Sequence, residues 1–407
     1  MKFRRLVAVT NSLCVGGALA VGAINTLAAD TNSNNEDLKA RVSALEELLQ
    51  KEGITPSSVQ TPKFVKAMSD ITISGFVTAS YFYDTSHPAN NSPNAYLWNR
   101  TSSAFTLNKF KLSLASKPVE ASGTDWSAGF KTSLIFGSDA PIVNTGGNNQ
   151  GWSDVREAYV EMNVPVGTGL NVKAGQLISL LNYESGDGGA VNENFSQGNQ
   201  WFYTGNGPSA GVQLGYTFTP WLDAKVRVQN GMYSGPFDNN TAKTLMAEIG
   251  LKPDSKSWIN LIGFGGQEST ALKIRGASLL AGYQFTPKLG SGLEFDYFNF
   301  DGSAVGPVAD DEWSIGGWLW YDFTSKVGLA LRAEYINDAT GFGTSGLLGF
   351  PSNNGGSLYG VTLTLNYKPV PNLKIQPEVR FDGTGVSGGF GSQTARVIVG
   401  CGASYLF

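Results

Sequence analysis

Ala395-Arg-Val-Ile-Val-Gly-Cys-Gly-Ala-Ser-Tyr-Leu-Phe407 ends the chain, and its side chains alternate in character along most of its length. In an extended strand, successive side chains point to opposite faces. One face carries Val397, Val399, Cys401, Ala403, Tyr405 and Phe407. The other carries mainly small or polar residues, with Ile398 and Leu406 as exceptions. The segment therefore predicts a β-strand that is apolar on one face and ends on an aromatic residue.

The composition argues against an ordinary soluble enzyme. Charged residues make up only 15% of the 407 residues, whereas aromatic residues reach 12% and glycine occurs 51 times. The chain is slightly hydrophilic on average, and after residue 29 no stretch approaches the ~20 apolar residues of a membrane helix. A β-barrel in a membrane combines these properties, because half of each strand faces lipid and half faces water.

Residues 1–29 have the features of a secretory signal peptide. A basic start with Lys2, Arg4 and Arg5 precedes an apolar core, and small residues follow at Ala28 and Ala29. Removal of this segment takes three of the 29 basic residues and none of the 33 acidic ones, so the net charge falls from −4 to −7. That charge argues against a nucleic-acid partner. Only Cys401 then remains, so no internal disulfide can form.

Residues 30–53 predict a short helix that can form a coiled coil. Its apolar positions, spaced by four, three and four residues, are Leu38, Val42, Leu45 and Leu49. This spacing fits the a and d positions of a heptad, but two heptads are marginal for an isolated coiled coil. Two alternatives follow: self-association, with a homotrimer as the most attractive state, or an amphipathic helix packed against another surface. Residues 54–70 form the expected linker to a domain at 71–407.

From residue 71 onward, sixteen segments alternate in polarity, and most match the 9–11 residues of a tilted membrane strand. Their approximate cores are 71–83, 105–115, 125–136, 155–164, 170–177, 210–219, 221–230, 244–252, 256–264, 277–286, 289–299, 312–323, 326–336, 357–368, 372–382 and 395–407. Segment 256–264 alternates poorly, so the number of strands could differ by two.

Short turns follow the even-numbered segments and longer Gly, Asn and Ser-rich loops separate the hairpins. The turns repeat a Tyr-x-Phe-Thr pattern, as at 216–219, 283–286 and 321–324. This alternation is typical of outer-membrane barrels, in which the short turns are periplasmic. The sequence predicts an all-β, antiparallel, up-and-down transmembrane barrel of about sixteen strands in the bacterial outer membrane. Its expected partners are the lipid bilayer and the barrel-assembly machinery, with Tyr405 and Phe407 as the assembly signal. A soluble sandwich or propeller is the alternative fold.

Catalysis has little support in the sequence. His87 is the only histidine, and no hydrolase, zinc, haem or phosphate-binding motif occurs. The acidic run Asp310-Asp-Glu312 lacks the ligand spacing of a calcium loop and is expected to be a solvated loop. We therefore expect no catalytic residue, no metal and no cofactor.

The charged residues on the predicted lumen faces suggest where a channel would narrow. Basic residues on the wall are Lys131, Lys173, Lys225 and Arg227. The longest loop within the barrel, 178–209, carries Glu184, Asp187 and Glu193. If this loop folds inward, its acidic groups would oppose the basic wall across a constriction, and the resulting field would sort ions by sign and size. If it folds outward, it is a solvated loop. Because acidic residues also face inward, the sequence leaves anion or cation preference open.

Two stretches resemble a known family. Ala104-Phe-Thr-Leu-Asn-Lys-Phe-Lys-Leu-Ser-Leu-Ala115 is similar to an early strand signature of the OmpL-like outer-membrane β-barrel porins, and a second match runs through 158–175. The loop elements Tyr183-Glu184, Asn194-Phe195-Ser196 and Asn230-Gly231 follow in the family's order. The resemblance covers roughly residues 70 to 407. It implies a water-filled channel for ions and small hydrophilic solutes, although it carries over no pore residues.

Two other functions remain open. A substrate-selective channel, for a sugar for example, would use an aromatic track, for which Trp201, Tyr203, Trp318 and Trp320 are candidates. A non-conducting structural anchor would have a plugged barrel and would use the helix at 37–52 to hold the cell wall or another protein.

Overall fold

The computed structural model describes residues 43, 44, 47, 70–88, 101–143, 155–234, 238, 240–306, 309–343, 355–390 and 392–407. Ser43, Ala44 and Glu47 are helical. The signal peptide at 1–29, the linker at 54–69 and the coiled-coil positions Leu38, Val42, Leu45 and Leu49 lie outside the described residues. No helix in the described ranges is long and apolar enough to cross a membrane.

The described residues contain sixteen strands, as the sequence predicts. They are β1 Ile71–Asp84, β2 Ala104–Ser116, β3 Ser127–Phe136, β4 Val155–Val164, β5 Leu170–Leu177, β6 Ser209–Thr219, β7 Leu222–Gln229, β8 Thr244–Leu251, β9 Ser257–Ser269, β10 Leu272–Thr286, β11 Leu289–Asp301, β12 Asp310–Asp322, β13 Val327–Asp338, β14 Gly356–Tyr367, β15 Leu373–Thr384 and β16 Ala395–Leu406. The short helical elements are α4 Ala140–Val143, η2 Gly188–Ala190 and α5 Asn199–Tyr203.

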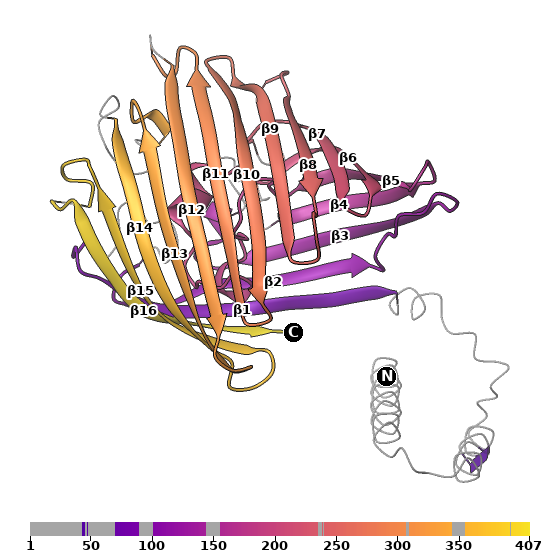
Figure 1. Ribbon diagram of the computed structural model, residues 1–407, viewed down its shortest axis with the longest axis horizontal. Coiled ribbons are helices and arrows are strands. Elements are labelled where there is room, and N and C mark those ends of the chain that lie inside the picture. The colour runs from indigo at the N-terminus through magenta and orange to yellow at the C-terminus, as the bar shows by residue number, and fades with distance from the viewer. Residues whose placement is uncertain are drawn as a thin grey trace, which may run out of the picture. The chain divides into compact units, whose positions relative to one another are not determined.

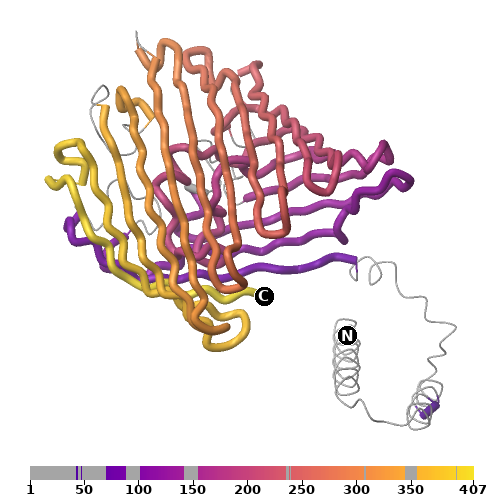
Figure 2. Tube along the Cα trace, in the orientation of Figure 1, coloured from indigo at the N-terminus to yellow at the C-terminus, as the bar shows by residue number. Residues whose placement is uncertain are grey.

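Each strand pairs antiparallel with its neighbours in sequence, and β1 pairs with β16, so the sheet closes into a barrel (Figures 1 and 2). At the seam the register sets Phe76 opposite Leu406. The backbones of Gly75 and Phe407 exchange two N–H to O hydrogen bonds of 2.9 Å. A closed sheet satisfies the backbone hydrogen bonds of every strand, which a strand in lipid requires.

Alternate side chains divide between lumen and lipid. On β14, Leu363 is 44% exposed on the outer face, whereas Thr362 beside it is 1% exposed on the inner face. Val399 and Tyr405 on β16, and Phe407 directly after it, are exposed on the outer face. The exposed apolar side chains are those that lipid covers, because the barrel turns its hydrophobic faces outward. The sequence exceptions Ile398 and Leu406 face inward: Ile398 is buried, and Leu406 lines an inner cavity.

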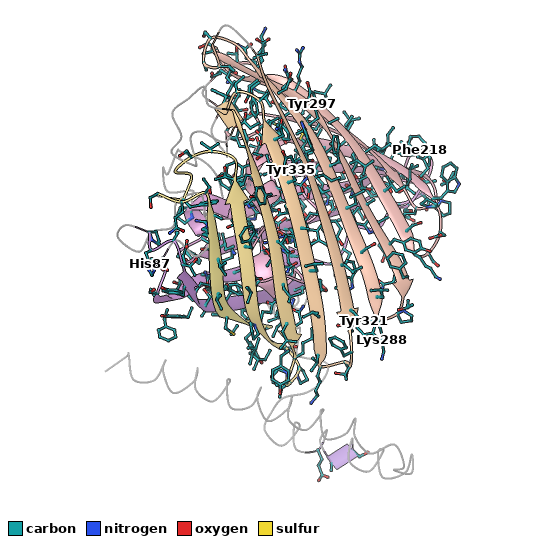
Figure 3. All side chains as sticks on the ribbon, turned by 60° about the vertical axis from the view of Figure 1, so that its left-hand side comes forward. His87, Phe218, Lys288, Tyr297, Tyr321 and Tyr335 are labelled. Carbon is teal, nitrogen blue, oxygen red and sulfur yellow. The ribbon has the colours of Figure 1, made fainter. Side chains whose placement is uncertain are left out.

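Aromatic pairs mark the end of the barrel that carries the short turns. The repeated Tyr-x-Phe sequence places two rings edge to face at Tyr283–Phe285 and Tyr321–Phe323, with centroids 4.8 and 5.1 Å apart. Figure 3 shows Tyr321 beside Lys288 at that end, with Tyr297 and Tyr335 farther along the sheet. Such rings are typical of the interface between membrane and water, and this end is the periplasmic one in barrels of this type.

Candidate functional site

The inner wall of the barrel carries charged side chains that are buried by other parts of the chain. On β13 and β15, Arg332, Glu334, Glu378, Arg380 and Asp382 are each at most 6% exposed. A buried charge is costly unless it is paired and hydrogen-bonded. A segment of the same chain must therefore cover this wall and supply the partners.

That segment is the loop at 178–209, which lies inside the lumen. Its element η2 contacts β1 and β16, and α5 contacts β12, β13 and β14. The wall carboxylate of Glu378 accepts hydrogen bonds from the backbone N–H groups of Phe195 and Ser196 at 2.8 and 3.2 Å. Glu334 accepts one from the N–H of Gln200 at 3.0 Å. Wall carboxylates therefore replace water at the loop backbone, which fixes the position of the loop.

Side chains of the loop add further bonds to the wall. Gln200 Nε2 and the hydroxyl of Thr204 donate to Asp296 at 2.8 and 2.9 Å. In the other direction, Arg380 donates to the carbonyl oxygen of Gln197 at 2.8 Å and to Asn199 Oδ1 at 2.7 Å. The anchored stretch thus runs from η2 to the end of α5, so the loop narrows the lumen on the β12–β16 side.

Arg332 is the centre of this contact. It is fully buried and donates to Glu184 at 2.8 Å and to the hydroxyl of Thr362 at 3.0 Å. Its Nε lies 3.0 Å from Glu334. Gly198 allows the loop to approach this closely, because a Cβ there would lie 2.0 Å from the Glu334 carboxylate. One guanidinium therefore joins a loop acid to a wall acid.

The three loop acids of the predicted constriction have separate partners. Glu184 binds Arg332 and accepts a 3.0 Å hydrogen bond from the indole N–H of Trp318. Asp187 pairs with Lys111 on β2 at 2.6 Å. Glu193 lies at the tip of the loop, where Asn366 Nδ2 is 3.4 Å from its carboxylate. The partners of the three acids thus lie on β2, β12, β13 and β14 and are not the four predicted basic residues.

The predicted basic residues lie on the other side of the lumen and pair with wall acids. Lys131 lies 2.8 Å from Glu157, Lys173 lies 3.3 Å from Glu161, and Lys225 lies 2.5 Å from Glu248. The lysine side chains remain 26 to 37% exposed, so solvent reaches them in the lumen. Because β3–β8 face β12–β16 across the barrel, three ion pairs with partly exposed lysines lie opposite the loop.

Arg227 differs from the three lysines because it is buried. It donates to Gln213 Oε1 at 2.7 Å and to the carbonyl oxygen of Ile178 at 2.7 Å. It thereby holds the start of the loop to β6 and β7. The predicted constriction stays a prediction, because only a measurement of ion current can test it. In it, the acids Glu184, Asp187 and Glu193 oppose the basic residues Lys131, Lys173, Lys225 and Arg227.

The sequence reasoning missed Arg332 and Arg380, which anchor the loop, and Arg396 beside them. Each occupies the lumen face of its strand, and Arg396 contacts Asp382 at 3.1 Å. A usable signal existed: Arg332 stands two residues from Glu334, and Arg380 stands two residues from both Glu378 and Asp382. Opposite charges on one strand face indicate paired groups, but not the loop that covers them.

The predicted aromatic track is divided in the structure. Trp318 and Trp320 face the lumen on β12 and line one cavity with Tyr183. Tyr203 is buried in a separate cluster with Ile336, Leu358 and Phe390. Burial raises the pKa of Tyr183, and the neighbouring carboxylates of Glu193 and Glu184 raise it further. The Tyr183 phenol therefore stays protonated at neutral pH.

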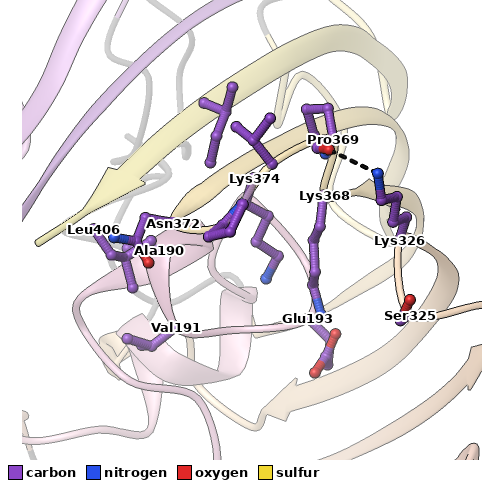
Figure 4. Close-up of a pocket in the computed structure, with 13 residues that line it drawn as sticks. Ala190, Val191, Glu193, Ser325, Lys326, Lys368, Pro369, Asn372, Lys374 and Leu406 are labelled. Atoms are coloured by element: carbon purple, nitrogen blue, oxygen red, sulfur yellow. Dashed lines mark hydrogen bonds between the residues drawn. The ribbon is translucent and has the colours of Figure 1, made fainter. Parts of the chain in front are cut away.

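Two cavities flank the tip of the loop. One of about 670 Å³ lies toward the short turns, and Lys326, Lys368 and Lys374 line it (Figure 4). Lys326 Nζ donates to the carbonyl oxygen of Pro369 at 3.1 Å (Figure 4). The other, of about 280 Å³, is lined by aromatic residues, and both cavities share Val191 and Glu193. Open space therefore remains around the tip of the loop.

The acidic run Asp310-Asp-Glu312 is not the solvated loop that the sequence suggests. It begins strand β12, and both Asp310 and Glu312 are fully buried. Asp310 accepts a 2.8 Å hydrogen bond from the backbone N–H of Thr340. Within the described ranges, no three His, Cys, Asp or Glu side chains are grouped so that they could hold a metal ion.

A family model matches residues 70–407, and its description is "Putative beta-barrel porin-2, OmpL-like". A comparison with curated proteins found no match.

Solved outer-membrane proteins share the fold at low sequence identity. The channel DcaP of Acinetobacter baumannii is 14% identical, with 83% of this chain and 97% of that chain covered and a TM-score of 0.54. The anion-selective porin from Comamonas acidovorans is 12% identical, with 83% and 99% covered and a TM-score of 0.56. OmpT of Vibrio cholerae in its trimer form is 11% identical, with 83% and 99% covered and a TM-score of 0.51. At these identities the similarity shows the fold.

Proposed function

We propose how this chain, which belongs to the OmpL-like family of β-barrel porins, works as an outer-membrane porin. The loop at 178–209 narrows its channel from one side and leaves a passage along the other. The observation that supports this is the asymmetry of the lumen. The β12–β16 wall is covered by the loop, whereas Lys131, Lys173 and Lys225 on the opposite wall remain partly exposed. Ions and small hydrophilic solutes pass by diffusion, and no catalytic step is involved.

The constriction is formed by the loop and the partly exposed wall opposite it. Each lysine on the passage has an acidic neighbour, so the wall is nearly neutral overall but carries charge in alternation. Passing ions exchange part of their water shell for these groups, and the sign of the charge on the wall decides which ions are favoured. Removal of the lysine charges leaves Glu161 and Glu248 unopposed in the passage.

The test is a double charge reversal, Lys173→Glu with Lys225→Glu, measured as the reversal potential in a KCl gradient across a planar bilayer. We expect a shift toward cation selectivity, because the passage wall loses two positive charges and gains two negative ones, a net change of −4 relative to the natural chain. The matched control is Lys243→Glu, whose lysine pairs with Asp238 outside the strands. Unchanged selectivity in the double variant would show that the passage does not run along β5–β8.

We further propose that the chain assembles as a homotrimer through the coiled-coil positions Leu38, Val42, Leu45 and Leu49. The heptad spacing supports this proposal, and the OmpT structure of similar fold is described as a trimer. The expected result is that the mature chain has the mass of a trimer in detergent. A chain without residues 30–53 should dissociate on dilution to a protein concentration at which the mature chain is still a trimer. Equal dissociation of both chains would assign assembly to the barrel surface.

A further inference from the structure

The smaller cavity beside the loop tip has an unusual lining. Four aromatic side chains surround it: Tyr183 from the loop, Trp258 from β9, and Trp318 and Trp320 from β12. The polar part of the lining is Glu184, Asn192 and Glu193, and no basic residue lines the cavity. The Asn192 amide is bonded to the backbone of Ser185. Two strands and the loop therefore bring aromatic rings and carboxylates together inside the lumen.

Glycines on the intervening strands make this arrangement possible. The register places Trp258, Gly282, Gly292 and Trp318 in one row across β9 to β12. A Cβ at Gly292 would lie 2.1 Å from the ring of Tyr183. The wall between the two tryptophans is therefore recessed by the width of the missing side chains, and the tyrosine ring occupies the recess.

The rings are held parallel to one another in this recess. Tyr183 stacks on Trp318 with centroids 4.5 Å apart and an interplanar angle of 28°. It stacks on Trp258 with centroids 5.9 Å apart and an angle of 8°. A similar contact supports Trp320, because a Cβ at Gly290 would lie 2.3 Å from its ring. Aromatic surface is thus fixed in the lumen before any solute arrives.

The hydrogen-bonding groups of the cavity are not all used. The indole N–H of Trp318 donates to Glu184, but within the described ranges those of Trp258 and Trp320 have no acceptor. The Glu193 carboxylate has one weak contact, the 3.4 Å approach of Asn366. The cavity therefore offers two free donors and one carboxylate acceptor beside half-buried aromatic rings.

We propose that this cavity is a binding site for a pyranose sugar passing through the channel. The apolar C–H face of a pyranose stacks on an aromatic ring, and its hydroxyl groups both donate and accept hydrogen bonds. An inorganic anion would be repelled by the carboxylates of Glu184 and Glu193, since no basic residue lines this cavity. An organic cation would use the rings and the carboxylate but would leave the indole donors unpaired.

A volume of about 280 Å³ accommodates one sugar ring at a time. Because the site lies beside the loop tip, an occupied site obstructs the ion passage. This inference rests on the proposed channel function, and it predicts that sugar flux saturates, whereas KCl conductance without sugar does not depend on the site.

The experiment measures KCl conductance of the full mature chain in a planar bilayer while glucose or maltose is added. We expect a saturable reduction in current. Trp320→Ala and, separately, Trp258→Ala should each raise the half-saturating sugar concentration about tenfold, because each removes one ring and one indole donor. The matched control is Trp313→Ala, which removes the same side chain from the lipid face of β12.

The outcomes are distinct. Normal KCl steps without a saturable sugar effect would overturn the sugar site and leave the porin function intact, whereas the absence of KCl steps from a folded barrel would overturn the channel itself. Block that survives both tryptophan substitutions would also overturn the site. Saturable block by choline and not by sugars would show that the cavity binds organic cations. If one variant fails to fold, the other still decides the result.

Discussion

At the scale of single residues, buried ion pairs decide where the loop lies. A buried pair contributes little net stability compared with a well-packed apolar contact, but the loss of one partner leaves the other charge without compensation. Arg332 has two acidic partners, Glu184 on the loop and Glu334 on the wall. The pairs therefore specify one position of the loop more strongly than they stabilise the barrel.

Substitution of Arg332 by alanine tests this reasoning. We expect a loss of about 3–5 kcal/mol in the free energy of unfolding, because two buried carboxylates lose their counter-charge. We also expect larger and noisier channel currents, because the loop is released from the wall. The measurements are denaturant unfolding in lipid vesicles and single-channel recording.

The control for this prediction is Arg275→Ala. Arg275 is exposed on β10 and its Nε donates to Asn299, so its removal should change stability by no more than about 0.5 kcal/mol. If Arg332→Ala gives currents with the noise and amplitude of the natural chain, the remaining bonds of the loop to Glu378 and Arg380 are sufficient to hold it.

At the scale of elements, the closing strand combines two tasks. Its backbone seals the barrel through the nine-residue register between β1 and β16, from Phe76–Leu406 to Asp84–Ile398. Its outer face presents Tyr405 and Phe407 to the surroundings. We propose that the barrel-assembly machinery recognises this outer face, since the backbone pairing needs no particular side chain there.

Phe407→Ala separates the two tasks. The expected result is several-fold less assembled barrel in the outer membrane of cells, whereas the purified variant refolds in detergent as well as the natural chain, because the backbone bonds to Gly75 remain. The readout is the fraction of protein that migrates in the folded form without heating. Leu406→Ala, on the inner face, is the control, and equal assembly of both variants would argue against a signal at Phe407.

At the scale of the whole molecule, the barrel reverses the usual placement of apolar residues. Leu331 in the middle of β13 is exposed between Leu319 and Leu363 on the neighbouring strands. Phe323 is exposed beside the short turn between β12 and β13. The cost of a charge on the outer face depends on depth in the membrane, so these two positions should respond differently to the same substitution.

Leu331→Arg should lower the free energy of unfolding from vesicles by about 2–4 kcal/mol, whereas Phe323→Arg should lower it by about 0–1 kcal/mol. The difference follows from the depth of each residue and not from packing, since both side chains face outward. Equal costs at the two positions would mean that the strand faces have been assigned to the wrong sides or that the membrane covers a different band.

The sequence by itself determined the barrel. Strand periodicity, short turns after even-numbered strands and the aromatic end of β16 are local patterns, because each lipid-facing strand must alternate and each hairpin must turn within a few residues. Even the poorly alternating segment at 256–264 is part of strand β9. The predicted lumen lysines also lie on the inner wall, since a period of two fixes the face of each residue.

Only the tertiary structure decided how the lumen is filled. The contacts of Glu184 with Arg332 and of Phe195 with Glu378 join residues 148 and 183 positions apart, and no periodicity relates such distant positions. The same is true of the aromatic cavity, where Tyr183 enters a recess formed by glycines of β10 and β11. Strand faces follow from local geometry, whereas the partner of a buried charge depends on which segment the closed barrel brings opposite to it.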